Sequence, residues 1–257
     1  MAQKTIAFFG ASGGVGLAAL KHSLAAGHQC IGLCRNPSKL TAALAAETTS
    51  NLKVVQGNVR DVEAVSQCLT TPEGRLVDEV IFTVGSRFVM SKMNLEDPHV
   101  CEHGMGALLQ AIADLRRKQQ QQQQQQEEEE GVGNTLHILA FSTTGMSRFG
   151  RDVPLSMVPF YHVALKVPHA DKRIMEDKLV ESGEAFTVVR ASLLFDGNSE
   201  TDTPVRVGIE DPKSGVIESK AIGYRISRED AGKWIARNFV LGAKEAKYVN
   251  KTITVTY

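Results

Sequence analysis

The sequence predicts an α/β fold built on a doubly wound parallel sheet, and three observations support this prediction. Apolar runs rich in β-branched residues alternate with segments of helical periodicity along most of the chain, which is the pattern of βαβ units. The chain opens with a buried-strand pattern, a glycine-rich turn and an amphipathic segment in immediate succession. Its 257 residues suffice for one substantial core. We therefore expect a single domain that spans residues 1–257.

The individual elements follow from the apolar patterns and from capping residues. Strands are expected at 5–9, 28–34, 52–56, 78–84, 136–141, 185–190 and 251–256, where short apolar runs are bounded by polar or turn residues. Helices are expected at 17–27, 36–46, 61–69, 99–117, 170–182 and 227–241. Three helix starts are marked by Pro37 at a first helical position and by Asp61 and Ser227 at N-cap positions.

Two stretches interrupt this alternation. Residues 118–133 hold one lysine, eight glutamines, four glutamates and Gly-Val-Gly, and such a tract cannot supply core residues. It either extends the preceding helix as a solvated projection or has no ordered structure. Residues 197–215 are rich in glycine, proline, serine, threonine and aspartate, so we predict a loop there.

Charge and cysteine content restrict the class of protein. Lys plus Arg equals Asp plus Glu, 29 against 29, so the net charge gives no global attraction to nucleic acid or to an anionic membrane surface. The chain has neither a transmembrane-length apolar stretch nor a signal-peptide pattern before the first strand, so a cytoplasmic location is expected. The four cysteines are expected to be buried thiols, with a redox pair of Cys30 and Cys34 as the alternative. No metal site is predicted, and the sequence does not indicate an oligomeric state.

The glycine-rich turn carries the clearest functional signal. Gly10, Gly13 and Gly16 have the spacing Gly-x-x-Gly-x-x-Gly between a strand and a helix. The first permits a sharp turn, the second permits close approach of a diphosphate because it has no Cβ, and the third permits close packing of helix on sheet. Free N–H groups at the helix start would face the phosphates. We predict a dinucleotide site, with a ligand-free structural turn as the alternative. The site also includes the residues Ser12, Gly14 and Val15.

The residue after the second strand predicts which dinucleotide is bound. An acidic residue here would hydrogen-bond the ribose 2′-hydroxyl of NAD, whereas an arginine accommodates the 2′-phosphate of NADP. Arg35 lies at this position, in a segment from Leu33 to Lys39 that contains no acid. Its guanidinium can contact a phosphate in bidentate fashion, and Ser12 and Lys39 can add to that contact. NADP(H) is therefore predicted, and a solvated surface charge at Arg35 is the alternative.

A further loop is predicted at the same edge of the sheet. Ligands of open α/β sheets bind at the carboxyl ends of the strands, and Val84, Gly85 and Arg87 follow the fourth strand. Gly85 would let the chain pass close to a ribose. Arg87 would reach a phosphate or the substrate, unless it is a plain loop arginine.

Together these motifs resemble the atypical short-chain dehydrogenases, nearest to the biliverdin reductase B or flavin reductase type, with NmrA-like proteins next. The segments that carry the resemblance occur in order at 6–13, 57–59, 84–87, 171–176, 181–183 and 224–230. The resemblance covers nearly the whole chain apart from the glutamine-rich tract. It implies a Rossmann-type fold with a small C-terminal substrate-binding portion, residues 191–257.

The resemblance also implies roles for residues outside the glycine turn. Asn58, followed by Val59, takes the place of an aspartate that lies beside the adenine in this superfamily. Ser142, with Thr143 behind it, ends the fifth strand, where a hydroxyl of short-chain dehydrogenases faces the nicotinamide and the substrate carbonyl. Satisfaction of backbone groups is the alternative role for these two hydroxyls.

The sequence departs from the family in its proton donor. Short-chain dehydrogenases usually place a lysine four residues after a tyrosine, where it lowers the tyrosine pKa. Here Lys166 follows Tyr161 one position too late, and Pro168 is predicted to break that helix. Lys172 is predicted to contact the nicotinamide ribose, although no tyrosine precedes it at that spacing. Tyr161 and His169 are the candidate proton donors.

Two functions follow from the resemblance. The first is an NADPH-dependent oxidoreductase that reduces a small conjugated or carbonyl-containing molecule, with solvent able to supply the proton. Positioning alone can lower a barrier by about 7–11 kcal/mol in well-oriented systems. The alternative is a regulator of NmrA type that binds NADP(H) without turnover. The hydroxyl at Ser142 favours the enzyme, whereas the missing tyrosine favours the regulator.

Overall fold

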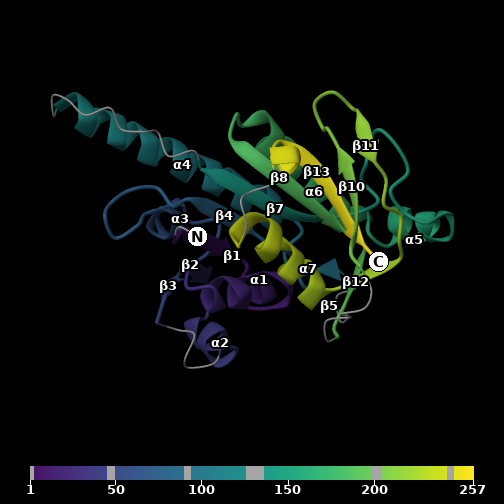
Figure 1. The fold of residues 1–257 in the computed structure, drawn as a ribbon, viewed down its shortest axis with the longest axis horizontal. Coiled ribbons are helices and arrows are strands. Elements are labelled where there is room, and N and C mark those ends of the chain that lie inside the picture. Colours follow the sequence, from purple (N-terminus) through teal and green to yellow (C-terminus); the bar gives the residue numbers. More distant parts are fainter. Residues whose placement is uncertain (1–2, 45–49, 90–93, 126–135, 198–203, 242–245) are drawn as a thin grey trace.

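The computed structural model describes residues 3–44, 50–89, 94–125, 136–197, 204–241 and 246–257, which form a large sheet between two layers of helices (Figure 1). From one edge to the other the strands are β11 (Ile217–Ser219), β10 (Arg206–Glu210), β13 (Lys251–Thr256), β8 (Ala185–Ala191), β7 (His137–Thr143), β4 (Glu79–Phe82), β1 (Thr5–Phe9), β2 (Gln29–Cys34) and β3 (Leu52–Gln56). The strands from β13 to β3 run parallel, and β10 and β11 pair antiparallel at one edge. The predicted doubly wound α/β fold is confirmed.

Helices cover both faces of the sheet. On one face α1 (Gly14–Ala25), α2 (Pro37–Ala42) and α7 (Arg228–Ile235) contribute to one apolar core cluster; on the other, α3 (Val62–Leu69), α4 (Val100–Gln125) and α6 (Lys166–Glu181) contribute to a second. Successive residues of β1 alternate between the two clusters, Ile6 and Phe8 in the first and Ala7 and Phe9 in the second. Because such a strand is buried on both faces, it is apolar along its whole length.

The chain path positions the functional edge of the sheet. It runs outward from β1 to β3, then returns to β4 on the other side of β1. The loops that follow β1 and β4 therefore diverge, and an open α/β sheet binds its ligands in the crevice between them.

Two helices begin earlier than predicted. α1 begins at Gly14 rather than Leu17, because Gly13 is extended (φ 176°) and its carbonyl already accepts a hydrogen bond from the Leu17 N–H at 3.3 Å. The glycines of this first turn carry no apolar periodicity. α6 begins at Lys166 and contains Pro168 in its first turn, where a missing N–H removes no hydrogen bond. The predicted break at Pro168 is therefore wrong.

The predicted loop at 197–215 is wrong over residues 206–210. β10 lies there and pairs with β13, with Val207 opposite Val255 and Ile209 opposite Ile253. The alternation of Val207 and Ile209 is the pattern of a half-buried strand, but five residues among many turn formers did not stand out. Two short pairs lie outside the main sheet, β9 (Leu193–Phe195) with β12 (Arg225–Ser227) and β5 (Phe88–Val89) with β6 (Asn94–Leu95). A short helix, α5 (Val158–Val163), precedes α6.

The helix that leads into the glutamine-rich tract is longer than predicted. α4 continues past the expected end at Arg117 as far as Gln125, and Figure 1 shows this end projecting beyond the rest of the fold. Glutamine is a good helix former, so the first half of the tract extends the helix as a projection. The remainder of the tract, 126–133, lies outside the described residues.

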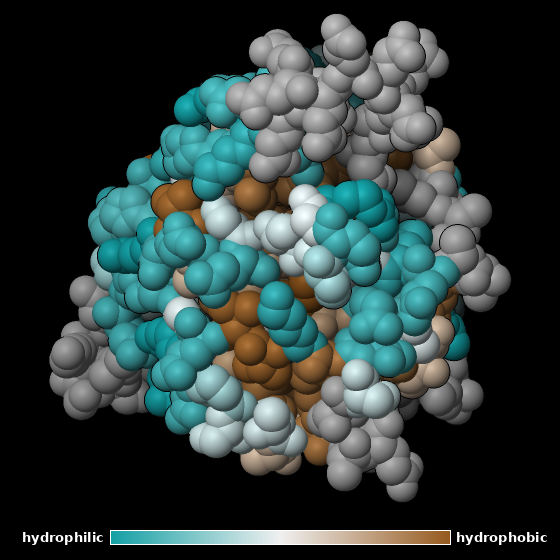
Figure 2. Space-filling model, turned by 90° about the vertical axis from the view of Figure 1, so that its left-hand side faces the viewer, coloured by the Kyte–Doolittle hydropathy of each residue, from teal (hydrophilic) through white to brown (hydrophobic). Residues whose placement is uncertain are grey.

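The outer surface is largely hydrophilic on the side shown in Figure 2, and the cysteine thiols lie in the interior. Seen from the side on which α4 projects, most of the surface is hydrophilic, and hydrophobic residues gather across its middle (Figure 2). Cys30, Cys34, Cys68 and Cys101 are all buried and free, so the prediction of buried thiols is confirmed. No helix within the described ranges has the length and apolar character needed to cross a membrane.

Candidate functional site

A cleft of about 780 Å³ opens at the carboxyl ends of the parallel strands. The turn after β1, the end of β2 and the loops after β3 and β4 form one part, and the end of β7, α6 and residues 191–194 form the other. All the predicted cofactor-binding residues line it: Gly10, Ser12, Gly13, Gly14, Val15, Gly16, Arg35, Asn58, Val59, Val84, Gly85, Arg87, Ser142, Thr143 and Lys172. Residues predicted from six separate segments thus meet in one place.

The three spaced glycines of the turn, Gly10, Gly13 and Gly16, have different structural roles. Gly10 has φ +92°, and a Cβ there would lie 2.7 Å from the backbone carbonyl of Thr83. A Cβ on Gly16 would lie 2.2 Å from Thr83 Oγ1 and 2.6 Å from the Gly10 carbonyl oxygen. By contrast, a Cβ on Gly13 would meet nothing within 4 Å. Two glycines therefore let α1 pack closely on the sheet, whereas Gly13 leaves open space on the cleft.

The start of α1 is suited to an anion. Its first turn carries no acidic side chain, and no side chain caps it. The first N–H groups of a helix lack partners within the helix, and the dipole makes this end positive. A diphosphate on the cleft side of Gly13 would satisfy both requirements.

Arg35 extends from the end of β2 into the cleft with an exposed side chain, and Ser12 and Lys39 line the same region. Its Nη1 lies 4.0 Å from Glu96 Oε1, and the two side chains are 76% and 52% exposed. No acid lies near Arg35 in the sequence; Glu96 belongs to a loop far along the chain and approaches it only in the fold. A wide, solvated ion pair contributes about 0–1 kcal/mol, so it competes weakly with a phosphate for the guanidinium.

The loops after β3 and β4 complete the part of the cleft around Arg35. Asn58 Oδ1 accepts a hydrogen bond from the backbone N–H of Arg60 at 3.1 Å, which fixes the turn that also carries Val59. The Arg87 carbonyl accepts a hydrogen bond from the Glu96 N–H at 2.8 Å and closes the loop after β4. This loop also brings Val84 and Gly85 to the cleft.

Ser142 and Lys172 lie at the other part of the cleft. Ser142 Oγ is buried and has no hydrogen-bond partner among the described residues. Lys172 Nζ donates a hydrogen bond to the Phe141 carbonyl at 3.0 Å, next to that serine in β7. The neighbouring Thr143 already donates its hydroxyl to the Ala191 carbonyl at 3.4 Å. Because an unpartnered buried hydroxyl costs free energy, the Ser142 position fits a polar group of a ligand.

The structure does not bring Tyr161 to the cleft. Its ring packs under the turn at Gly145, where a Cβ would lie 2.3 Å from Tyr161 Cδ1. Its hydroxyl accepts a hydrogen bond from Thr144 Oγ1 at 3.2 Å, and burial raises its pKa. His169 lies behind the same turn; burial lowers its pKa to about 4, which leaves the imidazole neutral at pH 7. Neither residue lines the cleft, so this geometry supports neither as its proton donor.

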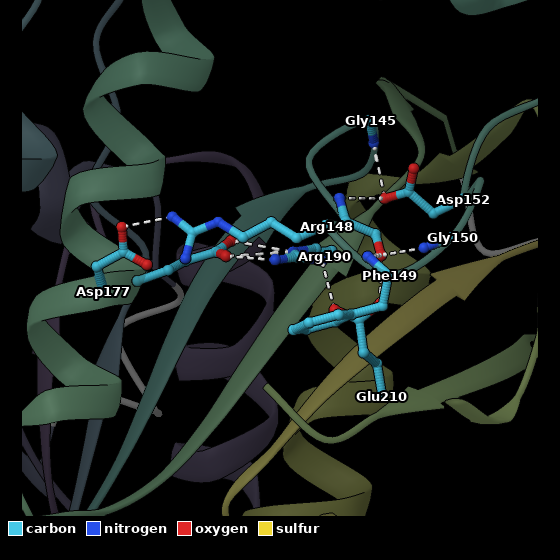
Figure 3. A network of polar contacts seen from close by, with 10 residues as sticks. Gly145, Arg148, Phe149, Gly150, Asp152, Asp177, Arg190 and Glu210 are labelled. Atoms are coloured by element: carbon cyan, nitrogen blue, oxygen red, sulfur yellow. Dashed lines mark hydrogen bonds and ion pairs between the residues drawn. The ribbon is translucent and has the colours of Figure 1, made fainter. Parts of the chain in front are cut away.

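A buried ion-pair network fixes α6 against the sheet (Figure 3). Arg190 of β8 is paired in register with Ser142 of β7. Its Nη2 donates to Glu176 Oε2 at 2.6 Å, its Nε lies 3.2 Å from both oxygens of that carboxylate, and its Nη1 donates to Glu210 at 3.2 Å. Because Glu176 follows Lys172 by one helical turn, the network holds the lysine at the level of the serine.

The residue before Lys172 ties α6 to α4. The Asp171 carboxylate is buried and accepts hydrogen bonds from the N–H groups of Cys101 at 3.0 Å and Glu102 at 2.8 Å. These groups lie at the start of α4, so a side chain from another helix caps it. Asp171 therefore anchors α6 to the start of α4, and its neighbour Lys172 lines the cleft.

The cleft residues Arg228 and Leu165 were not identified from the sequence as site residues. Arg228 lines the cleft beside the glycine turn, and its Nη1 lies 2.9 Å from Asp196 Oδ1. Leu165 adds apolar surface to the same cleft. No local pattern gives either residue this place, since each reaches the cleft only through tertiary packing. Leu193 and Leu194, which follow the predicted sixth strand on the expected substrate side, also line the cleft.

The cleft has the form expected of a dinucleotide-binding protein. The chain belongs to the NAD(P)H-binding family, whose model matches residues 10–239. This match confirms the predicted class of cofactor. The glycine turn, the free start of α1 and the unpartnered Ser142 hydroxyl all fit such a group.

Similar proteins lie among reductases and oxidases. The chain is 34% identical over 276 aligned residues to reductase pytE of Aspergillus terreus, covering 98% of each protein. It is 32% identical over 290 aligned residues to oxidase pynE of Aspergillus niger, covering 100% of this chain and 99% of the relative. A short-chain dehydrogenase/reductase from Veillonella parvula, solved in complex with NADP, has a similar fold with a TM-score of 0.69 at 15% identity, covering 100% of this chain and 95% of the other. The predicted Rossmann-type fold is therefore shared with a short-chain dehydrogenase/reductase.

Proposed function

We propose that this protein is an NADPH-dependent oxidoreductase that reduces a small conjugated or carbonyl-containing acceptor. The observation that carries the proposal is the buried Ser142 hydroxyl, which has no partner among the described residues and belongs to a residue that lines the cleft together with Lys172. The two similar proteins named above as a reductase and an oxidase support the reaction class.

Different residues along the cleft would bind different parts of the coenzyme and the acceptor. The turn at 10–16 and the start of α1 would hold the diphosphate, and Arg35 would hold the 2′-phosphate. Lys172 would position the nicotinamide ribose, and Ser142 would donate a hydrogen bond to the acceptor oxygen. NADPH bound in this way supplies a hydride. Solvent supplies the proton, because neither Tyr161 nor His169 lines the cleft.

Turnover can be tested directly. Purified protein is mixed with NADPH and a panel of quinones, flavins and tetrapyrroles, and the nicotinamide absorbance is followed. Consumption of NADPH with one class of acceptor supports the oxidoreductase. Tight NADPH binding without consumption of any acceptor favours the second candidate, a non-catalytic NADP(H)-binding regulator of NmrA type. That candidate is favoured by one observation: no tyrosine lines the described cleft.

Ser142→Ala should lower turnover by about 10² while leaving NADPH affinity nearly unchanged, because the hydroxyl acts on the acceptor. Stopped-flow reduction of the best acceptor and fluorescence titration of NADPH measure the two quantities. Thr143→Val is the matched control, since its hydroxyl is already bound to the Ala191 carbonyl. Equal turnover in both variants would contradict a role for Ser142.

Arg35→Asp should weaken NADPH binding by roughly 10- to 100-fold and leave NADH binding much less affected, because only NADPH carries the 2′-phosphate. Titration of both coenzymes gives the ratio of affinities. Arg117→Asp, a charge reversal on the exposed surface of α4, is the control. Equal losses for NADPH and NADH would show that Arg35 does not contact the 2′-phosphate.

A further inference from the structure

We propose that Arg228 binds the diphosphate of the dinucleotide. In the free protein, Asp196 holds the Arg228 side chain beside the glycine turn. This inference rests on the proposed cofactor site. It adds to the turn at 10–16 a cation from the C-terminal quarter of the chain, at the first position of α7.

The packing of α7 on α1 brings Arg228 to the cleft. A Cβ on Gly232 would lie 2.4 Å from Ala18 Cβ and 2.7 Å from the Val15 carbonyl oxygen, so only glycine permits the two helices to approach this closely. Arg228 precedes Gly232 by one helical turn and therefore lies further toward the start of α1. A Cβ on Gly14 would lie 3.4 Å from Arg228 Cδ and 3.8 Å from its Nε.

The electrostatics of this position call for an anion. The guanidinium lies beside the positive end of α1, and Arg228 is itself the first residue of α7, so the dipoles of both helices disfavour a cation here. Its ion-pair partner is Asp196, whose side chain is 92% exposed. A single solvated carboxylate compensates little. A diphosphate would bridge the guanidinium and the N–H groups of α1, and would replace Asp196.

Arg35 and Arg228 should then have separate roles. Arg35 lies at the end of β2 and would contact a group that only NADP(H) carries. Arg228 lies at the glycine turn and would contact a group that NADPH, NADH and ADP share. The assignment therefore predicts which fragments of the coenzyme each arginine recognises.

The experiment measures the binding of NADPH, NADH, ADP and 2′-AMP by calorimetry to the full chain and its variants. Arg228→Gln should weaken NADPH, NADH and ADP by at least about tenfold, and Arg228→Lys less, because lysine keeps the charge but not the fork. Binding of 2′-AMP, which lacks a diphosphate, should not change. Asp196→Asn should strengthen ADP binding by about two- to fivefold, since it frees the guanidinium. Lys21→Gln is the control, because this exposed cation of α1 lies near Arg228 but outside the cleft.

The outcomes separate this inference from the proposed function. If Arg228→Gln binds ADP as tightly as the parent, or loses 2′-AMP in parallel with ADP, the diphosphate assignment is overturned. If Asp196→Asn weakens ADP binding, the carboxylate does not compete with the ligand and that part of the proposal fails. A parent protein that binds none of the four ligands would instead refute the proposed cofactor site as a whole.

Discussion

Glu176→Ala is expected to lower the free energy of unfolding by about 3–5 kcal/mol, because it leaves a buried guanidinium without its main partner. The side chains of Arg190 and Glu176 are 8% and 7% exposed. Burial alone would lower the pKa of Arg190, but Glu176 and Glu210 raise it above its ordinary value, so the charge stays and must be compensated. Chemical denaturation measures the loss, and a melting temperature lower by about 10 °C is expected for a chain of this size.

The matched control lies one residue further along α6. Asp177 pairs with Arg148 at 2.7 Å, and these side chains are 40% and 54% exposed (Figure 3). Asp177→Ala removes the same kind of charge from the same helix but should cost no more than about 1 kcal/mol. Similar losses in the two variants would mean that burial of the Arg190 network does not determine stability.

Gly13→Val is expected to abolish most NADPH binding, by at least tenfold in affinity, while the free protein keeps its stability. Gly13 has φ 176°, an extended conformation that any residue adopts, and a Cβ there meets nothing within 4 Å. The added side chain would fill the space on the cleft that the diphosphate needs. Fluorescence titration and thermal unfolding together measure the two effects. Parental affinity in this variant would place the diphosphate elsewhere.

Gly10→Ala, in the same turn, is expected to affect the stability of the free protein. A residue with Cβ at φ +92° is strained by about 1–2 kcal/mol, and this Cβ would also lie 2.7 Å from the Thr83 carbonyl. Stability should therefore fall in the free protein. Substitution of Gly10 should therefore lower the stability of the free protein, whereas substitution of Gly13 should lower the affinity for NADPH.

A structural element could be predicted from the sequence where the residues that determine it are close together along the chain. The central parallel strands β1 and β7 were predictable because they are buried on both faces and read as nearly continuous apolar runs. The predicted strand 185–190 ends one residue before the observed end of β8 at Ala191. β10 was missed because its apolar residues alternate over only five positions, next to the edge strand β11.

The site residues also fall into those that a local sequence pattern predicts and those that only tertiary packing brings to the cleft. Gly10 and Arg35 follow directly after strands and Gly13 lies in the turn after β1, where the fold itself predicts a ligand, and all three line the cleft. Glu96 and Arg228 reach the cleft through a folded loop and through helix packing at Gly232, which no spacing along the chain encodes. Tyr161 shows the converse, since its residue type suggested chemistry but its environment is a packed turn.

The long helix α4 has its start fixed beside the cleft by Asp171, and its other end runs out past the sheet (Figure 1). A helix lengthens along its own axis by about 1.5 Å for each residue added. Glutamines gained or lost within residues 119–125 would therefore change how far this projecting end of α4 reaches. The number of glutamines at this point should therefore not affect coenzyme binding.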